Sequence, residues 1–400
     1  MRHPEHHIFA HTPDSLAEWC VERGMAPYRA AQILEWVYAR GVIDPEAMTN
    51  LSKRDRRTLA EEMTFLSGPT IAHQVATDGT QKLLIQWNDG GDPDNSSATD
   101  PLEGTLARAL PVLDAAGIDY GAGDPSRQTE CVMIPDRRGP RRTACISSQV
   151  GCPVGCRFCA SGLGGLDGNL SAGRIIEQVW RLGGLLRAGE RAEADAPSTL
   201  PGPARISNIV FMGMGEPLAN FAAVTRAVRT IAADWGVGIS ARKITISTVG
   251  MHRAIERLAD EMDLPITLAL SLHAPNDQLR RELIPWAEFT TIDQLLAACQ
   301  RWFDKTGREI TLEYVLLGGV NDRPEHAAEL AGVANRLRAN VNLIRFNEVG
   351  DVPYKRPETA DVRAFQDILR NRGVNTHIRA SRGRDIAAAC GQLRHEAAAT

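Results

Sequence analysis

The sequence predicts an α/β fold. Its main body is a partial parallel barrel of six strand-helix units, preceded by a small N-terminal helical module and a short β-extension. Three observations support this. From about residue 143, short apolar strands alternate with helical stretches, as in parallel barrels. Residues 14–65 are helical in pattern throughout. Asp78-Gly79 separates two strand-like runs, and this dipeptide is typical of hairpin turns.

The helical module is predicted from an apolar stripe. Ala30, Ile33, Leu34 and Val37 follow the i, i+3, i+4, i+7 spacing of one helix face. Asn50-Leu-Ser52 supplies an N-cap for the charged helix after it.

The β-extension is predicted to hold strands at residues 71–77, 81–87 and 129–134. Residues 89–127 and 188–204 are rich in Gly, Asp, Pro and Ser, so we expect two surface insertions without catalytic groups. The first insertion should contain a short helix near residues 106–115.

The barrel strands are expected at residues 144–147, 206–212, 243–247, 266–271, 310–316 and 342–346. The helices that follow them are expected at residues 172–186, 221–233, 251–260, 292–303, 324–337 and 360–371, with a last short strand at 375–379. We therefore expect four parts: the helical module (1–68), the β-extension with its insertion (69–142), the barrel (143–380) and a C-terminal segment (381–400).

Composition narrows the class of protein. The 400 residues, 43% hydrophobic and 24% charged, suffice for one large domain with an accessory one. The sequence has no run of about 18 apolar residues and no signal core, so we expect no membrane association. Eight cysteines, several of them clustered, favour a reducing, cytoplasmic location. The net charge of −4 gives no global case for nucleic-acid binding, although arginines gather at 137–142 and again at Arg379, Arg382 and Arg384.

Cys152, Cys156 and Cys159 stand in one loop with C-x3-C-x2-C spacing. Such a loop suits a [4Fe-4S] cluster in which three irons are held by thiolates and the fourth stays open to a substrate or cofactor. A structural zinc site is the alternative, but zinc in that role takes four protein ligands. No histidine lies between His73 and His252, so the fourth ligand would be another cysteine or a distant residue. The spacing therefore favours the open iron-sulfur cluster.

Glycine-rich or polar segments follow the other predicted strands, and in parallel barrels the active site lies where strands end. Gly213-Met-Gly-Glu-Pro217 lacks the spacing of a dinucleotide fingerprint. Its glycines allow close backbone approach to a ligand, and its glutamate could hold an ammonium group. Ser247, the segment Ser271-Leu-His273 and Asn347 occupy corresponding positions. These groups should meet the cysteine loop at one rim.

These motifs resemble those of the RlmN rRNA methyltransferases, a family of radical S-adenosylmethionine (SAM) enzymes. The resemblance rests on Cys145-Ile-Ser-Ser-Gln-Val-Gly-Cys152, Gly213-Met-Gly-Glu-Pro217, Leu270-Ser-Leu-His273 and Asp385-Ile-Ala-Ala-Ala-Cys-Gly-Gln-Leu393. It extends to the helical module through Pro27-Tyr-Arg-Ala-Ala-Gln-Ile-Leu-Glu-Trp36 and Met48-Thr-Asn-Leu-Ser52. The insertions and the arginine-rich stretch before Cys145 depart from the family pattern, and these departures lie outside the core motifs.

The resemblance implies a radical SAM barrel and a role for each site residue. Cys152, Cys156 and Cys159 would bind the [4Fe-4S] cluster. SAM would meet the open iron with the help of Gly215, Glu216, Ser247, Ser271, Leu272, His273 and Asn347. Cys390 would carry the methyl group, Cys145 would form a disulfide with it, and Glu130 would accept a proton.

The implied reaction is methylation of carbon 2 of an adenine in 23S rRNA, and of an adenine beside the anticodon of some tRNAs. This carbon is a poor nucleophile. A first SAM would therefore methylate Cys390, and a 5′-deoxyadenosyl radical from a second SAM would take hydrogen from that S-methyl group. The target base must leave its stack, and the basic helical module at 14–65 would contact phosphates. The resemblance also implies a monomer and an electron donor such as flavodoxin.

Three alternatives remain open. A Cfr-type enzyme would use the same cysteines but methylate adenine carbon 8, although the N-terminal match favours RlmN. A glycyl-radical activase would keep the cluster but would not need Cys390. A non-catalytic iron-sulfur or zinc protein would not need Gly213-Met-Gly-Glu-Pro217. Outside the predicted sites, Cys20, Cys131 and Cys299 are expected to be structural.

Overall fold

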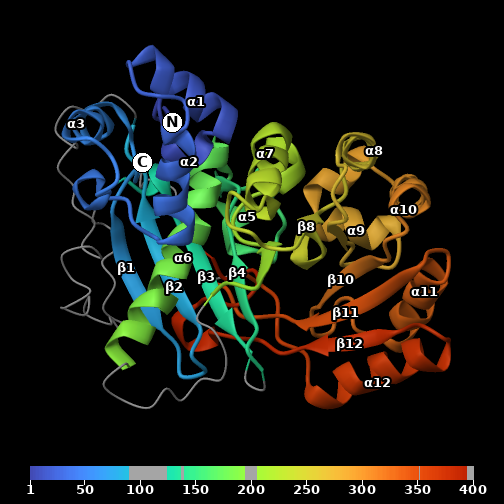
Figure 1. Cartoon of the computed structure of the whole chain (residues 1–400). Helices are drawn as coiled ribbons and strands as arrows, with labels where there is room; N and C mark the ends of the chain where they lie inside the picture. Colours follow the sequence, from blue (N-terminus) through green and yellow to red (C-terminus); the bar gives the residue numbers. More distant parts are fainter. Residues whose placement is uncertain (90–123, 137–138, 194–204, 351, 394–400) are drawn as a thin grey trace.

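The computed structural model describes residues 1–89, 124–136, 139–193, 205–350 and 352–393 (Figure 1). The helix predicted near 106–115 lies outside these residues, as does most of both insertions. Within the described ranges, no helix combines the length and apolarity needed to span a membrane.

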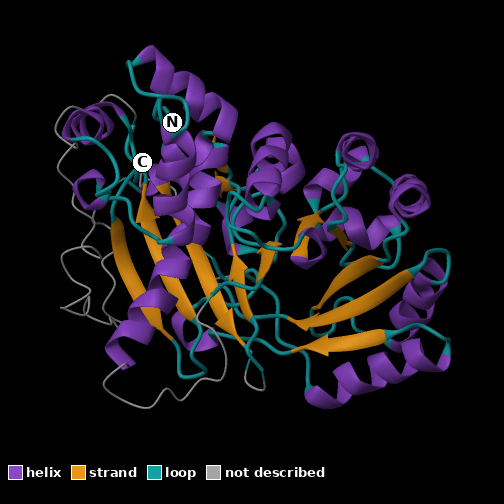
Figure 2. Ribbon diagram, in the orientation of Figure 1, coloured by secondary structure: helices purple, strands orange, loops and turns teal. Residues whose placement is uncertain are grey.

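One ten-stranded sheet forms the frame of the molecule, in the order β1-β2-β3-β4-β7-β8-β9-β10-β11-β12. Its strands are drawn in orange in Figure 2. The strands are β1 (Thr70–Val75), β2 (Gln81–Gln86), β3 (Gln128–Pro135), β4 (Arg142–Cys145), β7 (Asn208–Phe211), β8 (Ile244–Thr248), β9 (Thr267–Ser271), β10 (Ile310–Leu316), β11 (Ala339–Arg345) and β12 (Thr376–Arg379). Pairing is antiparallel from β1 to β4 and parallel from β4 to β12. Because β1 and β12 are the two edges of this sheet, the barrel is open.

Six strand-helix units follow one another from β4 to α12, which confirms the predicted partial barrel. The helices of these units are α6 (Ala172–Glu193), α7 (Phe221–Ala232), α8 (His252–Glu261), α10 (Ile292–Thr306), α11 (Pro324–Ala334) and α12 (Thr359–Asn371). Two additions were not predicted. The cysteine loop carries the short α5 (Ala160–Leu163) and a two-stranded sheet of β5 (Gln149–Gly151) and β6 (Leu166–Asn169). Helix α9 (Asp277–Leu283) precedes α10. Elements of three to seven residues are too short to show helical or alternating periodicity clearly.

The helical module consists of α1 (Pro13–Glu22), α2 (Arg29–Leu34), a π-helical turn (Glu35–Ala39) and α3 (Lys53–Glu62). The predicted N-cap is present, because the Ser52 hydroxyl accepts a hydrogen bond from the amide of Asp55 at 3.1 Å. The apolar residues of the module join the same hydrophobic core as those between the barrel helices and the sheet.

A buried polar network fixes the module to α6. The Glu177 carboxylate accepts hydrogen bonds from the Ser67 hydroxyl at 2.7 Å and from Arg181 at 2.6 Å, and His7 Nε2 lies 3.1 Å from it. Burial alone would raise the pKa of Glu177, but the Arg181 charge and these hydrogen bonds prevail and lower it to about 2. The ionised carboxylate therefore holds three separate chain segments together.

The C-terminal segment 383–393 packs against the β-extension and β4, on the inner side of the open barrel. Ile386, Ala388 and Leu393 form a small apolar cluster with Val132 and Cys145. The amide of Gly383 donates to Asp78, in the β1–β2 turn, at 3.2 Å. These contacts place residues about 240 to 305 positions apart beside one another, including the cysteines discussed below.

Candidate active site

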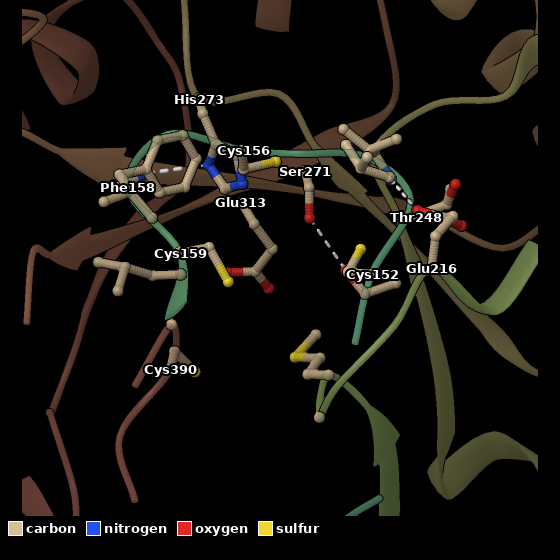
Figure 3. Close-up of a pocket in the computed structure, with 18 of the residues that line it drawn as sticks. Cys152, Cys156, Phe158, Cys159, Glu216, Thr248, Ser271, His273, Glu313 and Cys390 are labelled. Atoms are coloured by element: carbon tan, nitrogen blue, oxygen red, sulfur yellow. Dashed lines mark hydrogen bonds between the residues drawn. The ribbon is translucent and has the colours of Figure 1, made fainter. Parts of the chain in front are cut away.

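A cavity of about 890 Å³ opens at the carboxyl ends of the barrel strands (Figure 3). The strand-end groups singled out in the sequence meet there. Its lining includes Cys152, Cys156, Cys159, Gly213, Gly215, Glu216, Ser247, Ser271, His273, Asn347 and Cys390. Residues from six segments of the chain therefore share one cavity.

The three loop cysteines all line this cavity. Burial, with the Cys159 thiol and the Glu216 carboxylate nearby, raises the pKa of Cys152 to about 12. Burial and the two other loop thiols also raise the pKa of Cys156, against the charge of Arg280. Three clustered thiols of raised pKa are in an environment where a bound cation would favour the thiolate form.

The geometry of these thiols bears on which metal they could hold. In the described ranges, no group of three or more His, Cys, Asp or Glu side chains is arranged around a position for one metal ion. A cubane cluster does not require such convergence, because each thiolate binds a different iron. The donor set of three thiolates in a cavity with adjoining space thus fits a [4Fe-4S] cluster with one open iron.

The Gly213–Pro217 loop packs tightly against the segment after β4. A Cβ atom on Gly213 would lie 2.7 Å from the carbonyl of Ile146, and one on Gly215 would lie 2.7 Å from the Cβ of Gln149. Gly215 also has φ +99°, which side-chain-bearing residues rarely adopt. Both glycines are therefore needed to bring this loop against the base of the cysteine loop.

Glu216 bridges two strand-end loops. Its carboxylate accepts hydrogen bonds from the amide of Leu218 at 2.9 Å and from the amide of Val249 at 2.8 Å. Burial raises its pKa, against the hydrogen bonds it accepts from Val249, Leu218 and Thr248. The carboxylate lines the cavity, so it is positioned to meet a cationic ligand group.

Ser247 and Ser271 end adjacent strands, and their hydroxyls lie 3.1 Å apart at the cavity wall. Leu272 differs from its neighbours: its side chain is fully buried in the main hydrophobic core and is not among the residues that line the cavity. Any contact of Leu272 with a ligand would therefore involve its backbone.

His273 is held in an unusual conformation beside the cysteine loop. Its φ is +58°, and its Nδ1 accepts a hydrogen bond from the amide of Val315 at 3.1 Å. Burial, and the charge of Arg280, lower its pKa to about 3. The ring is therefore neutral with its proton on Nε2, and it packs edge-on against Phe158 at 5.1 Å between ring centroids.

Cys390 and Cys145 line a second cavity of about 690 Å³. Cys390 lines both cavities, as do Met212, Glu313, Ile344 and Asn347, so the two cavities adjoin one another. The Cys390 residue is exposed within this concave space, whereas Cys145 is buried. Burial raises the pKa of Cys145, and the neighbouring Cys390 thiol raises it further. All eight cysteines are free in the structure, so the predicted disulfide is not formed.

Glu130 lies outside the lining of both cavities. It is buried on β3, where its carboxylate forms an ion pair with Lys82 at 2.6 Å. Lys82 also donates to the carbonyl of Ala387 at 3.3 Å, and the Glu130 amide contacts the sulfur of Met214 at 3.3 Å. Glu130 thus lies beside the segment that carries Cys390 and the glycine loop, and its role stays a prediction.

The sequence interpretation missed Glu313. This buried carboxyl group lines both cavities from the middle of β10 and accepts a hydrogen bond from the side-chain amide of Asn342 at 2.9 Å (Figure 3). Burial raises its pKa, against the charge of Arg379 and the Asn342 hydrogen bond. The sequence did hold a signal for this residue, because Glu313 is an acidic residue inside the mostly apolar strand Ile310–Leu316, and an acidic residue in a buried strand often has a functional role.

The chain is similar to known proteins over nearly its whole length. The family described as the ribosomal RNA large subunit methyltransferase N-terminal domain matches residues 7–65, and the radical SAM superfamily matches residues 202–331. A probable dual-specificity RNA methyltransferase RlmN from Rhodopirellula baltica is 39% identical over 98% of this chain and 91% of its own length. Its counterpart from Moorella thermoacetica is 41% identical over 96% of this chain and 95% of its own length. A radical SAM methyltransferase structure from Sphaerobacter thermophilus superposes with a TM-score of 0.81 at 37% identity, covering 98% of this chain and all of that one.

Proposed function

The chain belongs to the RlmN family of radical SAM methyltransferases, and we propose that it methylates carbon 2 of an adenine in 23S rRNA and of an adenine beside the anticodon of some tRNAs. The observation that carries the proposal is that Cys390 lines both the cavity of the three loop cysteines and the adjoining cavity that contains Cys145. The relatives named dual-specificity RNA methyltransferases support the choice of RNA as substrate.

Enzymes of this family use a [4Fe-4S] cluster and SAM, which when bound supply one electron, the methyl group and a radical. In the proposal, Cys152, Cys156 and Cys159 hold the cluster. Glu216 faces the amino group of SAM, and Ser247, Ser271, His273 and Asn347 complete the SAM site from neighbouring strand ends.

Cys390 is the proposed methyl carrier. Its sulfur takes the methyl group from SAM and gives up its thiol proton, and the Asn347 amide fixes the backbone carbonyl of this residue at 3.1 Å. After the carbon has joined the base, the adduct would lose one electron, for which the cluster would be the acceptor, and its ring proton would go to Glu130. The Cys145 thiolate would then attack the Cys390 sulfur. The carbon-sulfur bond would break as the disulfide forms, and the departing carbon would take up a proton to become the methyl group. A reductant must restore both thiols before the next turnover.

Replacing Cys390 tests this proposal. Cys390→Ala should abolish RNA methylation while the protein retains its iron and cleaves SAM reductively. Cys299→Ala is the matched control, because Cys299 is buried in α10 away from both cavities and should leave methylation in place. Undiminished methylation by Cys390→Ala would overturn the proposed carrier.

Mass spectrometry of the methylated nucleoside distinguishes carbon 2 from carbon 8, the product of a Cfr-type enzyme. We further propose that the protein acts as a cytoplasmic monomer with an electron donor such as flavodoxin. Reconstituting methylation with reduced flavodoxin as the only reductant tests the donor.

A further inference from the structure

Five arginines gather beside the two cavities, on β11, β12 and the segments after them. We call these residues, Arg345, Arg356, Arg379, Arg382 and Arg384, the arginine rim. Arg379 and Arg382 line the second cavity together with Cys145 and Cys390. Arg345 lines the neighbouring cavity near Asn347.

The positive charges of the rim are close enough to act on one another. Burial lowers the pKa of Arg356, and the charges of Arg384 and Arg345 lower it further, while Glu348 opposes them. Arg356 is anchored by donation to the carbonyl of Phe346 at 2.7 Å and to the side chain of Asn347 at 3.0 Å. The rim is therefore fixed to the same asparagine that holds Cys390.

Acidic residues near the rim have other partners. Asp78 accepts from the amides of Thr80 at 3.0 Å and Gly383 at 3.2 Å, and Arg382 lies 3.8 Å from it. Asp385 accepts from the amide of Thr77 at 2.8 Å. Glu313 faces the interior and bonds with Asn342. Among the described residues, only Arg382 of the rim forms an ion pair with one of these acids, and the five guanidinium groups outnumber the four acidic side chains around them, Glu348 included.

Arg379 and Arg384 are the two arginines of the rim that are most accessible to a ligand. Both are exposed, and neither side chain makes a hydrogen bond or ion pair with any residue in the described part of the chain. In the helical module, the arginines at 23, 29, 40 and 56 are each paired with an acidic side chain, whereas Arg54 and Arg57 are exposed and form no ion pair in the described part of the chain. Arg379 differs from these two module arginines because it lines the cavity that also holds Cys390.

We propose that the arginine rim binds the backbone phosphates of RNA on either side of the adenine that enters the cavity, with Arg379 and Arg384 making the principal contacts. This inference rests on the proposed function and adds the surface that holds the substrate. A base that leaves its stack draws the flanking backbone to the mouth of the site, and guanidinium groups bind phosphate oxygens in a bidentate manner. Such contacts compensate the energy of extracting the base.

The test is RNA binding by the cluster-loaded full chain as a function of salt concentration. The probe is a fluorescently labelled RNA hairpin whose loop holds unpaired adenines, followed by fluorescence anisotropy. The test variant is Arg379→Gln/Arg384→Gln. The matched control is Arg242→Gln/Lys243→Gln, which removes two exposed charges just before β8, at the opposite end of the barrel. Iron content and circular dichroism establish that both variants are folded and loaded.

Loss of two phosphate contacts should lower the slope of log Kd against log salt by about 1.4 and raise Kd about 25-fold at 0.1 M salt. The control should stay within about twofold of the unmodified protein. If the test variant shifts no more than the control, the rim is not the RNA surface. That result leaves the proposed function standing, because methylation by the unmodified protein and its loss in Cys390→Ala are measured separately.

Discussion

The side-chain amide of Asn347 donates a hydrogen bond to the backbone carbonyl of Cys390 at 3.1 Å, which ties the end of β11 to the C-terminal segment. Asn347 was expected to contact SAM. The structure gives it a second task, since the same side chain accepts from Arg356 at 3.0 Å. One residue thus connects the strand-end loops, the predicted methyl carrier and the arginine rim.

The Asn347 bond should affect methyl transfer more than SAM cleavage. Asn347→Asp keeps the acceptor for Arg356 but removes the donor to Cys390, a loss of about 1.4 kcal/mol in positioning. We expect RNA methylation to fall about tenfold relative to SAM cleavage measured in the same reaction. If both activities fall in equal proportion, the bond does not position Cys390.

Gly215 should not tolerate a side chain. Gly215→Ala combines a positive φ with a Cβ 2.7 Å from Gln149, so the free energy of unfolding should fall by about 3 kcal/mol, with weaker SAM binding. Gly373→Ala is the control, because it has a similar φ of +82° but open space, and should cost about 1 kcal/mol. Urea denaturation measures both. Equal losses would show that the close approach to Gln149 is not what requires glycine.

The buried Glu177–Arg181 ion pair should contribute far more to the free energy of unfolding than the exposed Arg257–Glu261 ion pair. Glu177→Ala leaves Arg181 buried without its partner and should cost about 3 to 5 kcal/mol in urea denaturation. The control is Glu261→Ala, which removes an equivalent i,i+4 pair with Arg257 on the surface and should cost about 0.5 kcal/mol or less.

The Glu177 carboxylate should also make the stability of the protein depend on pH in the acid range. Its pKa of about 2 lies below the usual value, so its contribution is complete above about pH 4.5 and is lost as the pH falls toward 2. Glu177→Gln should therefore show a flatter decline of stability across that range. An unchanged decline would mean that other carboxyl groups dominate acid unfolding.

Glu313 should have the opposite pH dependence. Burial raises its pKa, so the folded state holds the proton more tightly and stability falls as the pH rises from the unfolded to the folded pKa. Glu313→Gln keeps an acceptor for Asn342 and should stabilise the protein at neutral pH but not below pH 4.5. Denaturation midpoints of Glu313→Gln and the unmodified protein should be compared at pH 4.5 and at pH 7.5. If the midpoint shifts equally at both pH values, the raised pKa of Glu313 does not control this part of the stability.

Much of the fold followed from local patterns. Strand-helix alternation predicted the six barrel units, and Asp78-Gly79 predicted the hairpin, because long periodic elements and tight turns carry their signal within a few residues. The short α5, β5, β6 and α9 were missed. Their few residues are stabilised by contacts with distant segments, such as the amide of Arg157 donating to the carbonyl of Leu283 at 3.0 Å.

The sequence by itself determined the donor atoms and their order: a loop of three cysteines, glycines at a strand end, and two further cysteines 245 positions apart in the chain. Tertiary structure alone decided which of these share a cavity. It brought Cys390 beside Cys145, left Leu272 and Glu130 outside the cavity lining, and added Glu313. The physical reason is that side-chain chemistry is fixed residue by residue. Proximity instead depends on how the whole sheet curves and on where the C-terminal segment packs against it.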